Sequence, residues 1–104
     1  MPDVYYSERA LADLDRLLDF IAEHDPFAAR RAAEVIVDAV RVPERHPLIG
    51  RAAHGELREL VISHGRTGYV ALYRLLNRLL RVEVLALRHQ REAGYAGLDM
   101  PRPK

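Results

Sequence analysis

Cysteine and tryptophan are both absent from the chain of 104 residues. The lack of cysteine excludes disulfides, thiolate metal ligands and a thiolate nucleophile. Long apolar runs are missing too: none approaches the roughly 20 residues of a membrane-spanning helix, and the start MPDVYYSERA has no secretory signal pattern. We therefore expect one domain over residues 1–104, located in the cytoplasm without a membrane partner, with a flexible tail at 98–104.

Lysine is nearly absent as well, because Lys104 is the only lysine among the 16 basic residues. The net charge of +1 hides an asymmetry along the chain. Residues 1–40 carry nine acids and four arginines, whereas residues 41–104 carry twelve basic residues and six acids. Guanidinium groups pair with carboxylates or phosphates through two parallel hydrogen bonds, so the basic part is where we expect an anionic partner. An arginine-rich genome would also explain this composition.

The first forty residues predict a strand followed by two helices. Val4-Tyr5-Tyr6 favours a strand, and Ser7 is a good N-cap for the helix that follows it. Asp25 caps the second helix, with Pro26 at its first position, and Pro43 ends it. The two helices follow each other closely, so they are expected to form an antiparallel hairpin.

Both helices carry an apolar stripe at helical spacing. The stripe of the first helix is formed by Leu11, Leu14, Leu18 and Ile21. The side chains of this helix that are expected to face water are Asp13, Asp15, Arg16, Asp19 and Glu23. The stripe of the second helix is formed by Ala29, Ala33, Ile36 and Val40.

The rest of the chain predicts a loop over 41–56 and then a three-stranded meander. The strands are expected at 57–62, 69–75 and 80–87, with turns at 65–68 and 76–78. A sheet of this kind buries one face and leaves the other in water, and the helical hairpin would cover the buried face. The expected fold class is α+β: an N-terminal strand and an antiparallel helical hairpin packed on an antiparallel sheet with a three-stranded C-terminal meander.

Several polar and aromatic residues of the predicted sheet have structural explanations. Arg58 and Glu59 are neighbours on a strand and point to opposite faces, and a buried arginine would need a carboxylate such as Glu83 as its partner. Tyr69 and Tyr73 share a face with aliphatic residues, so core packing explains these rings without base stacking.

Several segments occur in the order found in the ParE/RelE toxin superfamily, which the chain resembles over roughly residues 3–95. They are the acidic helix of the form AxxDLxxLxxxIAExDP, the loop HPLIGR, the strand LREL, the stretch GYVALYRL and the last strand VEVLALRHQREAGY. The resemblance implies a small toxin of a type II toxin–antitoxin system that a neighbouring antitoxin holds inactive. RelE-like members are ribosome-dependent ribonucleases, whereas ParE-like members poison DNA gyrase and are not known as nucleases.

The residues after the last strand favour the ParE-like branch, in which the chain poisons gyrase and is not an enzyme. RNA cleavage requires a deprotonated 2′-hydroxyl, a neutralised phosphorane and a protonated leaving oxygen. In a RelE-like enzyme these functions would fall to Arg66, Arg88, His89, Arg91 and Tyr95. The segment RHQREAGY departs from the RelE-like spacing and has no lysine. The alternatives are a RelE-like mRNA interferase, acting on the ribosome and mRNA, and a degenerate toxin that only binds its antitoxin.

Histidine and tyrosine near the C-terminus also have structural explanations. Tyr95 would pack the tail onto the sheet, and a histidine such as His89 after a strand is more often structural than catalytic. The remaining histidines are scattered, so we expect no metal and no cofactor. A chelator should therefore leave the melting temperature and the growth arrest unchanged, and a large loss of either would contradict this expectation.

The antitoxin is expected to be an acidic, ParD-like segment that folds on binding and places an amphipathic helix beside the helical hairpin. Apolar contacts would supply much of the affinity, and arginines would pair with its carboxylates. The arginines expected to bind the antitoxin or the target are Arg58, Arg66, Arg74, Arg88 and Arg91.

Overall fold

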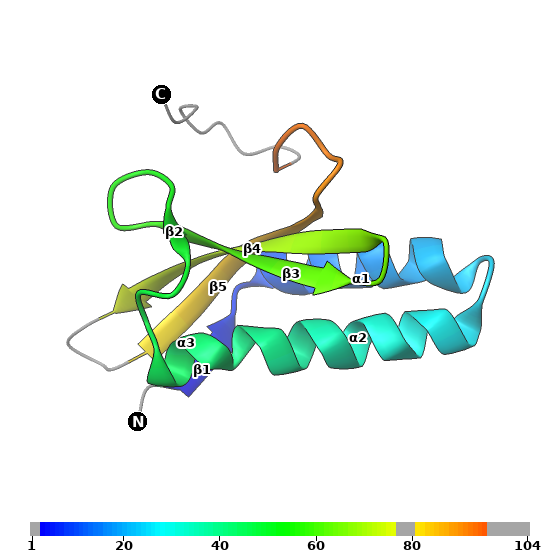
Figure 1. The fold of residues 1–104 in the computed structure, drawn as a ribbon, viewed down its shortest axis with the longest axis horizontal. Helices are drawn as coiled ribbons and strands as arrows, with labels where there is room; N and C mark the ends of the chain where they lie inside the picture. Colours follow the sequence, from blue (N-terminus) through cyan, green and yellow to red (C-terminus); the bar gives the residue numbers. More distant parts are fainter. Residues whose placement is uncertain (1–2, 77–80, 96–104) are drawn as a thin grey trace.

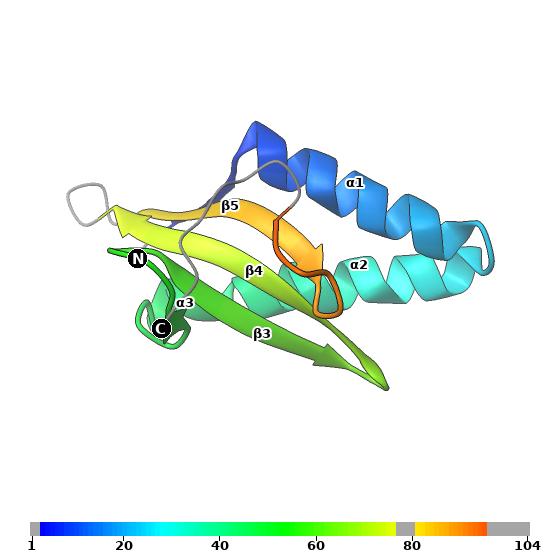
Figure 2. The same cartoon turned by 90° about the horizontal axis from the view of Figure 1, so that it is seen from above.

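The structure, a computed structural model, describes residues 3–76 and 81–95. Its elements in chain order are β1 (Asp3–Tyr6), α1 (Glu8–Ala22), α2 (Pro26–Val40), α3 (Val42–Arg45), β2 (Arg51–Ala52), β3 (Arg58–His64), β4 (Thr67–Leu76) and β5 (Arg81–His89). The strands form one sheet in the order β1-β5-β4-β3-β2. The α1–α2 hairpin lies along one face of this sheet, with α1 against β5 and α2 against β3 (Figure 1, Figure 2).

The predicted α+β class and the β3–β4–β5 meander are confirmed, but the sheet is mixed instead of antiparallel. Strand β1 runs parallel to β5, with Asp3 opposite Arg81 and Tyr6 opposite Val84. The direction of the meander strands follows from the few residues that separate each strand from the next in the sequence. No such short connection links β1 to its neighbour, because three helices and three strands separate β1 from β5. The sequence pattern therefore predicts β1 but not its direction.

Helix α1 begins at the predicted N-cap, and the cap residue also bonds the sheet. The Ser7 hydroxyl accepts from the Ala10 N–H at 3.0 Å, as an N-cap does. The same hydroxyl donates to the Leu85 carbonyl at 2.9 Å, and the Ser7 N–H donates to the Val84 carbonyl at 2.9 Å. Ser7 thus joins the start of α1 to β5 beyond the end of β1.

The face that α1 turns toward the sheet agrees with the predicted stripe only in part. Leu14 and Ile21 pack against the core as predicted. Asp13, predicted to face water, is only 5% exposed, whereas Leu11 is 50% exposed. The Asp13 carboxylate accepts from the Leu87 N–H at 2.9 Å and from the Arg9 Nε at 3.1 Å. Beyond the end of β1, this carboxylate bonds the edge of β5 at a position where no strand does. Helix α1 therefore buries the side containing Ala10, Asp13 and Leu17.

Helix α2 begins as predicted, but the loop after it contains further structure. The Asp25 carboxylate accepts from the N–H groups of Phe27 and Ala28. Pro43, predicted to stop the helical run, lies buried in the first turn of the short helix α3, where a missing N–H costs nothing. Further on, β2 pairs with β3. The loop predicted over 41–56 is therefore a folded connection.

The turn between β3 and β4 is shorter than predicted. His64 pairs with Thr67 and Ser63 pairs with Gly68, so the turn is formed by Gly65 and Arg66 alone. Gly65 has a φ of 60°, a left-handed conformation that favours glycine. The turn predicted at 76–78 and the tail predicted at 98–104 lie outside the described residues, except for Leu76 at the end of β4.

A β-bulge in β5 changes which side chains face the helices. Tyr73 of β4 lies opposite Val84, but the preceding Leu72 lies opposite Ala86, so Leu85 is an extra residue. Before the bulge Val84 packs in the core under the helices, and after it Leu87 does so. The alternation has shifted by one residue, which is the effect of a bulge. Residues after Leu85 therefore face the side opposite to the one that unbroken alternation predicts.

The face of the sheet opposite the helices, here called the outer face, is partly covered instead of fully wet. Its buried residues are Val70, Leu72, Ala86 and Tyr95, with Ala53, Leu57 and Leu85 packed against them. The main core on the helix side includes Ile36, Tyr69 and Leu87. The predicted packing of Tyr69 and Tyr73 is confirmed, since both rings are buried. A prediction of one wet face is wrong because the β2 loop and the segment after β5 cover it.

Candidate functional site

Three polar side chains meet on the outer face of the sheet: Glu59 of β3, Arg88 of β5 and Tyr95 of the segment after β5. We call them the Glu59–Arg88–Tyr95 cluster. Alternation along β3 directs Glu59 to this face, and the bulge at Leu85 directs Arg88 there. Two of the three, Arg88 and Tyr95, belong to the residues that a RelE-like reaction would require.

The cluster is held by hydrogen bonds to the Glu59 carboxylate. The Tyr95 hydroxyl donates to Glu59 Oε2 at 2.6 Å, and Arg51 Nε donates to Glu59 Oε1 at 3.1 Å. Arg88 Nη2 forms an ion pair with Glu59 Oε2 at 3.8 Å. The Arg88 guanidinium also lies over the Tyr95 ring, 5.2 Å from its centroid, a cation–π distance. Both oxygens of Glu59 are thus engaged.

Arg88 has a second set of partners in the backbone of the turn after β5. Its Nη1 donates to the carbonyls of His89, Gln90 and Glu92 at 3.3, 3.3 and 3.0 Å. The side chain of Arg88 is only 14% exposed. These bonds hold the turn against the sheet, and the Tyr95 ring then packs on the outer face. The predicted packing role of Tyr95 is confirmed.

Burial raises the pKa of the Tyr95 hydroxyl well above its usual value, and the hydrogen bond to the Glu59 carboxylate raises it further. The Tyr95 hydroxyl therefore holds its proton in the folded protein under conditions in which an exposed tyrosine would lose it. In this structure the Tyr95 hydroxyl donates its hydrogen bond to the Glu59 carboxylate.

Because the pKa of Tyr95 is raised in the folded state, stability should fall at alkaline pH. Above a pH of about 10 the unfolded chain releases the tyrosine proton that the folded chain retains, so the free energy of unfolding decreases as pH rises. We expect this decrease to be smaller in Tyr95→Phe, which has no proton to release. Urea denaturation at about pH 8 and about pH 10.5 measures it. Tyr5→Phe, at an exposed tyrosine, is the control. If the free energy of unfolding falls equally between the two pH values in the unsubstituted protein, Tyr95→Phe and Tyr5→Phe, the prediction is contradicted.

The other residues predicted for a RelE-like reaction lie away from the cluster. His89 and Arg91 line a groove between α1 and the sheet, on the helix side. The His89 ring packs edge-on against Tyr69, and its Nδ1 accepts from the Arg91 N–H at 3.1 Å. Arg66 is exposed in the β3–β4 turn. The structure therefore does not bring the five predicted residues together.

Two more of the predicted binding arginines, besides Arg88, have partners within the chain. Arg58 Nη1 donates to the carbonyls of Leu48 and Gly50, at 3.3 and 2.7 Å. The predicted pairing of Arg58 with Glu83 is therefore wrong, because Glu83 accepts from Arg74 Nε at 2.8 Å across the β4–β5 pair. Backbone carbonyl oxygens of the folded connection accept the hydrogen bonds of Arg58, and the sequence does not indicate such acceptors.

Glu59 is the residue of the site that sequence reasoning missed. Its position next to Arg58 indicated opposite faces correctly, but nothing local indicated that Arg51, Arg88 and Tyr95 would converge on it. The signal that was present is the alternation of β3, which puts Glu59 on the outer face. The missing information was the bulge at Leu85.

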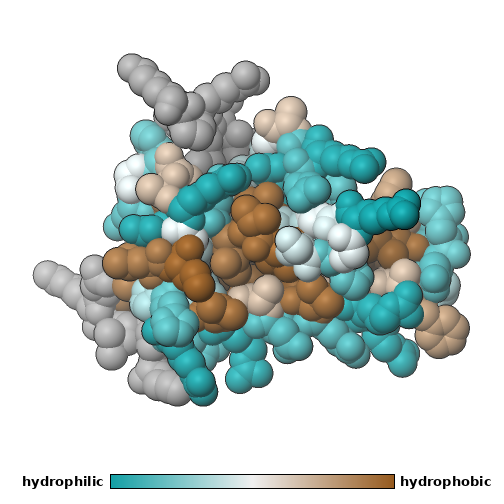
Figure 3. All heavy atoms as spheres, viewed as in Figure 1, coloured by the Kyte–Doolittle hydropathy of each residue, from teal (hydrophilic) through white to brown (hydrophobic). Residues whose placement is uncertain are grey.

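Apolar side chains also gather on the surface. Figure 3 shows them over the region where β3 lies beside α2. The large exposed apolar residues include Phe20 and Phe27 near the end of the helical hairpin, at 68% and 71%. Among residues 3–76 and 81–95, no helix has the length and apolar character to span a bilayer. Aromatic rings exposed to this extent are available for contact with a partner protein.

The fold and the cluster define a small α+β protein with a helical hairpin on one side of a sheet and a closed Glu59–Arg88–Tyr95 network on the other. Residues 4–94 match the family described as the ParE toxin of the type II toxin–antitoxin system parDE. The chain belongs to this family, so the predicted ParE/RelE superfamily is confirmed.

Relatives and a solved structure agree with this assignment. Toxin RelE2 of Caulobacter vibrioides is 36% identical over 89 residues, which cover 86% of this chain and 96% of the relative. Toxin RelE3 of the same organism is 35% identical over 75 residues, or 72% of this chain and 82% of the relative. A structure of the chromosomal ParDE TA system from P. aeruginosa matches with a TM-score of 0.69 at 22% identity, covering 86% of this chain and 96% of that chain. This likeness shows the shared fold.

Proposed function

We propose that this toxin arrests growth by binding DNA gyrase in the cytoplasm, and not by cutting RNA. One observation carries the proposal: the two residues of the outer face best placed for RNA cleavage are already engaged with a carboxylate. Tyr95 donates to Glu59 at 2.6 Å, and Arg88 pairs with the same oxygen at 3.8 Å. A phosphate that approached Arg88 would meet the negative charge of Glu59 and would have to displace it.

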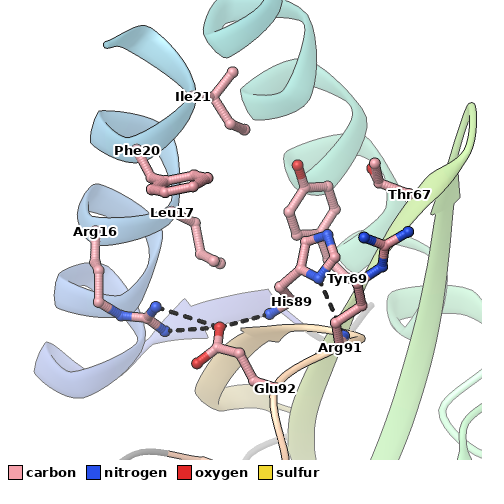
Figure 4. Close-up of a pocket in the computed structure, with 9 residues that line it drawn as sticks. All are labelled: Arg16, Leu17, Phe20, Ile21, Thr67, Tyr69, His89, Arg91 and Glu92. Atoms are coloured by element: carbon pink, nitrogen blue, oxygen red, sulfur yellow. Dashed lines mark hydrogen bonds and ion pairs between the residues drawn. The ribbon is translucent and has the colours of Figure 1, made fainter. Parts of the chain in front are cut away.

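RNA cleavage by side chains also needs a proton acceptor near the cations. His89, the candidate acceptor next to Arg88 in the sequence, faces the helix side of the sheet, where it packs against Tyr69 (Figure 4). Loss of a positioned proton-transfer group typically lowers a rate by a factor of about 10² to 10⁴. On the outer face, the only acceptor and the only hydroxyl of the cluster, Glu59 and Tyr95, are bonded to each other, so neither is free to exchange a proton with RNA and the cluster is a poor ribonuclease site.

Binding to a large enzyme has no such requirement. The chain presents exposed arginines such as Arg66 and Arg91, and exposed rings such as Phe20 and Phe27. Arginines and aromatic rings are enriched among the residues that carry most of the affinity of protein interfaces. These surfaces support a mode of action in which contacts are spread over the toxin and no single side chain is catalytic.

The experiment incubates the purified toxin with gyrase and supercoiled plasmid, and in parallel with translating ribosomes. We expect cleaved plasmid in the gyrase reaction and intact mRNA in the ribosome reaction. Tyr95→Phe keeps the ring on the outer face, so it should retain its effect on gyrase and on growth. Codon-specific cuts in mRNA that disappear in Tyr95→Phe, with gyrase unaffected, would overturn the proposal.

A RelE-like interferase is the second candidate, favoured by the position of Arg88 over the Tyr95 ring on one face of the sheet. The relatives bear the name RelE, which adds to this candidate. It requires the Glu59 carboxylate to leave Tyr95 when RNA binds. Glu59→Gln would then raise mRNA cleavage by removing the competing charge, whereas the gyrase proposal expects no cleavage in either form.

We further propose that an acidic, ParD-like antitoxin masks the toxin. Of the arginines predicted to bind it, Arg74 and Arg88 are paired with Glu83 and Glu59 inside the chain, and Arg58 is bonded to backbone carbonyls. The predicted antitoxin contacts therefore fall to the exposed Arg66 and Arg91. Affinity should decrease as salt rises, and failure of the two proteins to form a complex at any salt concentration would overturn this part of the proposal.

A further inference from the structure

Strand β3 is fully paired on one side only. On that side it pairs with β4 from Arg58 to His64. On the other side β2 pairs with Arg58 and Glu59 alone. Within residues 3–76 and 81–95, no strand lies beside the part of β3 from Leu60 to His64. We call this part the open edge.

The open edge directs backbone groups away from β4. The N–H and carbonyl groups of alternate residues in a strand point to the same side. The Leu57 carbonyl accepts from the Ala53 N–H at 2.9 Å, on the side of β2. The backbone groups of Val61 and Ser63 therefore point to that side too, beyond the last residue that β2 pairs with. A row of such groups is a template for pairing with another strand.

The sequence of the open edge does not oppose such pairing. Exposed edge strands are commonly protected by charged side chains, proline or a bulge. The segment from Leu60 to Gly65, LVISHG, has no proline and no acid, lysine or arginine. Its register with β4 is regular. Val61 is 49% exposed, and Figure 3 shows apolar side chains where β3 lies beside α2. The open edge is therefore suited to a partner strand that is itself uncharged.

We propose that the open edge pairs with the same edge of a second copy of the chain, as two antiparallel strands related by a two-fold axis beside Ser63. In this register Ser63 faces its counterpart, and Val61 faces the counterpart of Gly65. The turn of the second copy then stops short of Glu59, so β2 does not block the pairing. Identical charged edges would repel each other, whereas two neutral edges do not. An acidic segment would find no arginine or lysine between Leu60 and Gly65 to attract it.

This pairing would join the two sheets into one continuous sheet. The two-fold axis of antiparallel strands is perpendicular to the sheet, so both helical hairpins would lie on the same face. The outer face of each copy, with its Glu59–Arg88–Tyr95 cluster, would lie on the other. Because only a short segment of each strand takes part, we expect weak association, with a dissociation constant on the order of 10 µM.

Sedimentation of the purified toxin over a range of concentrations tests the pairing. Val61→Lys places a charge on each open edge and should raise the dissociation constant of the dimer by about tenfold or more. Leu11→Lys is the matched control, because this residue of α1 is 50% exposed and lies outside β3. Its dissociation constant should stay within about twofold of the parent. Both side chains are exposed, so neither variant is expected to unfold, and circular dichroism checks this.

A single introduced cysteine reports the register, because the chain has no cysteine of its own. Ser63→Cys should form a disulfide-linked dimer under mild oxidation, since opposed residues of antiparallel strands lie about 4.5 to 5.5 Å apart between Cα atoms. Asp15→Cys, at an exposed position of α1, measures cross-linking by random collision.

Three results would overturn the proposal. One is a toxin that remains monomeric at about 100 µM, ten times the expected dissociation constant. Another is a dimer that Val61→Lys and Leu11→Lys weaken equally, or in which Ser63→Cys cross-links no faster than Asp15→Cys. The third is a monomeric toxin whose binding to the antitoxin is weakened by Val61→Lys, which would assign the open edge to the antitoxin instead.

Discussion

Asp13→Ala is expected to lower the free energy of unfolding by about 3 kcal/mol. The substitution removes a carboxylate that is 5% exposed and leaves the Leu87 N–H without its partner. It also removes the bond that Arg9 Nε makes to Asp13 at 3.1 Å. An unsatisfied N–H in the interior costs more than the lost bond itself, because it was desolvated on folding.

Urea denaturation measures this loss, with Asp15→Ala as the control. Asp15 lies on the same helix but is exposed, so its replacement should change stability by less than about 0.5 kcal/mol. Asp13→Asn should fall between the two, because its amide oxygen still accepts from Leu87. If Asp13→Ala and Asp15→Ala unfold at the same urea concentration, the side chain of Asp13 does not join α1 to β5.

Gly50→Ala is expected to destabilise the protein by about 3 kcal/mol. A Cβ at this position would lie 2.6 Å from Cε1 of Tyr73 and 2.8 Å from the Glu59 carbonyl oxygen. The Tyr73 ring is 1% exposed and cannot move aside. Its hydroxyl accepts from the Gly50 N–H and donates to the Pro47 carbonyl, both at 2.8 Å, so displacement would also break these bonds.

Gly94→Ala is the matched control, because a Cβ there meets nothing within 4 Å. Thermal unfolding of the two variants should show a large decrease in melting temperature for Gly50→Ala alone. A neutral Gly50→Ala would mean that the connection between α3 and β2 moves away from Tyr73 at little cost.

Local features of the fold were predictable from the sequence, and distant ones were not. The caps at Ser7 and Asp25 depend on bonds to residues two or three positions away, so short motifs indicate them. Asp13 looked like a solvent-facing residue because its partner, Leu87, is 74 residues away. Periodicity describes one segment at a time and therefore carries no information about such a contact.

The same distinction applies to the candidate site. Arg88 and Tyr95 were predicted as candidates from their residue types and their place after a strand. Their pairing with Glu59 depends on the bulge at Leu85, which turns Arg88 to the outer face. A bulge leaves no pattern in an apolar segment such as VEVLALR, where both faces carry aliphatic side chains. A groove beside the helical hairpin was predicted, but its lining residues were not, because they come from segments at opposite ends of the chain.

The parallel pairing of β1 with β5 constrains the order of events during synthesis. Ser7 and Leu85, which are hydrogen-bonded to each other, lie 78 residues apart. The α1–α2 hairpin consists of local contacts and can form early, whereas contacts between distant residues close slowly. On the ribosome, β1 cannot pair with its neighbour until β5 has been synthesised. A chain interrupted before β5 lacks both Arg88 and His89, so the fragment has neither the Glu59–Arg88–Tyr95 cluster nor a partner strand for β1, and both form only once translation is nearly complete.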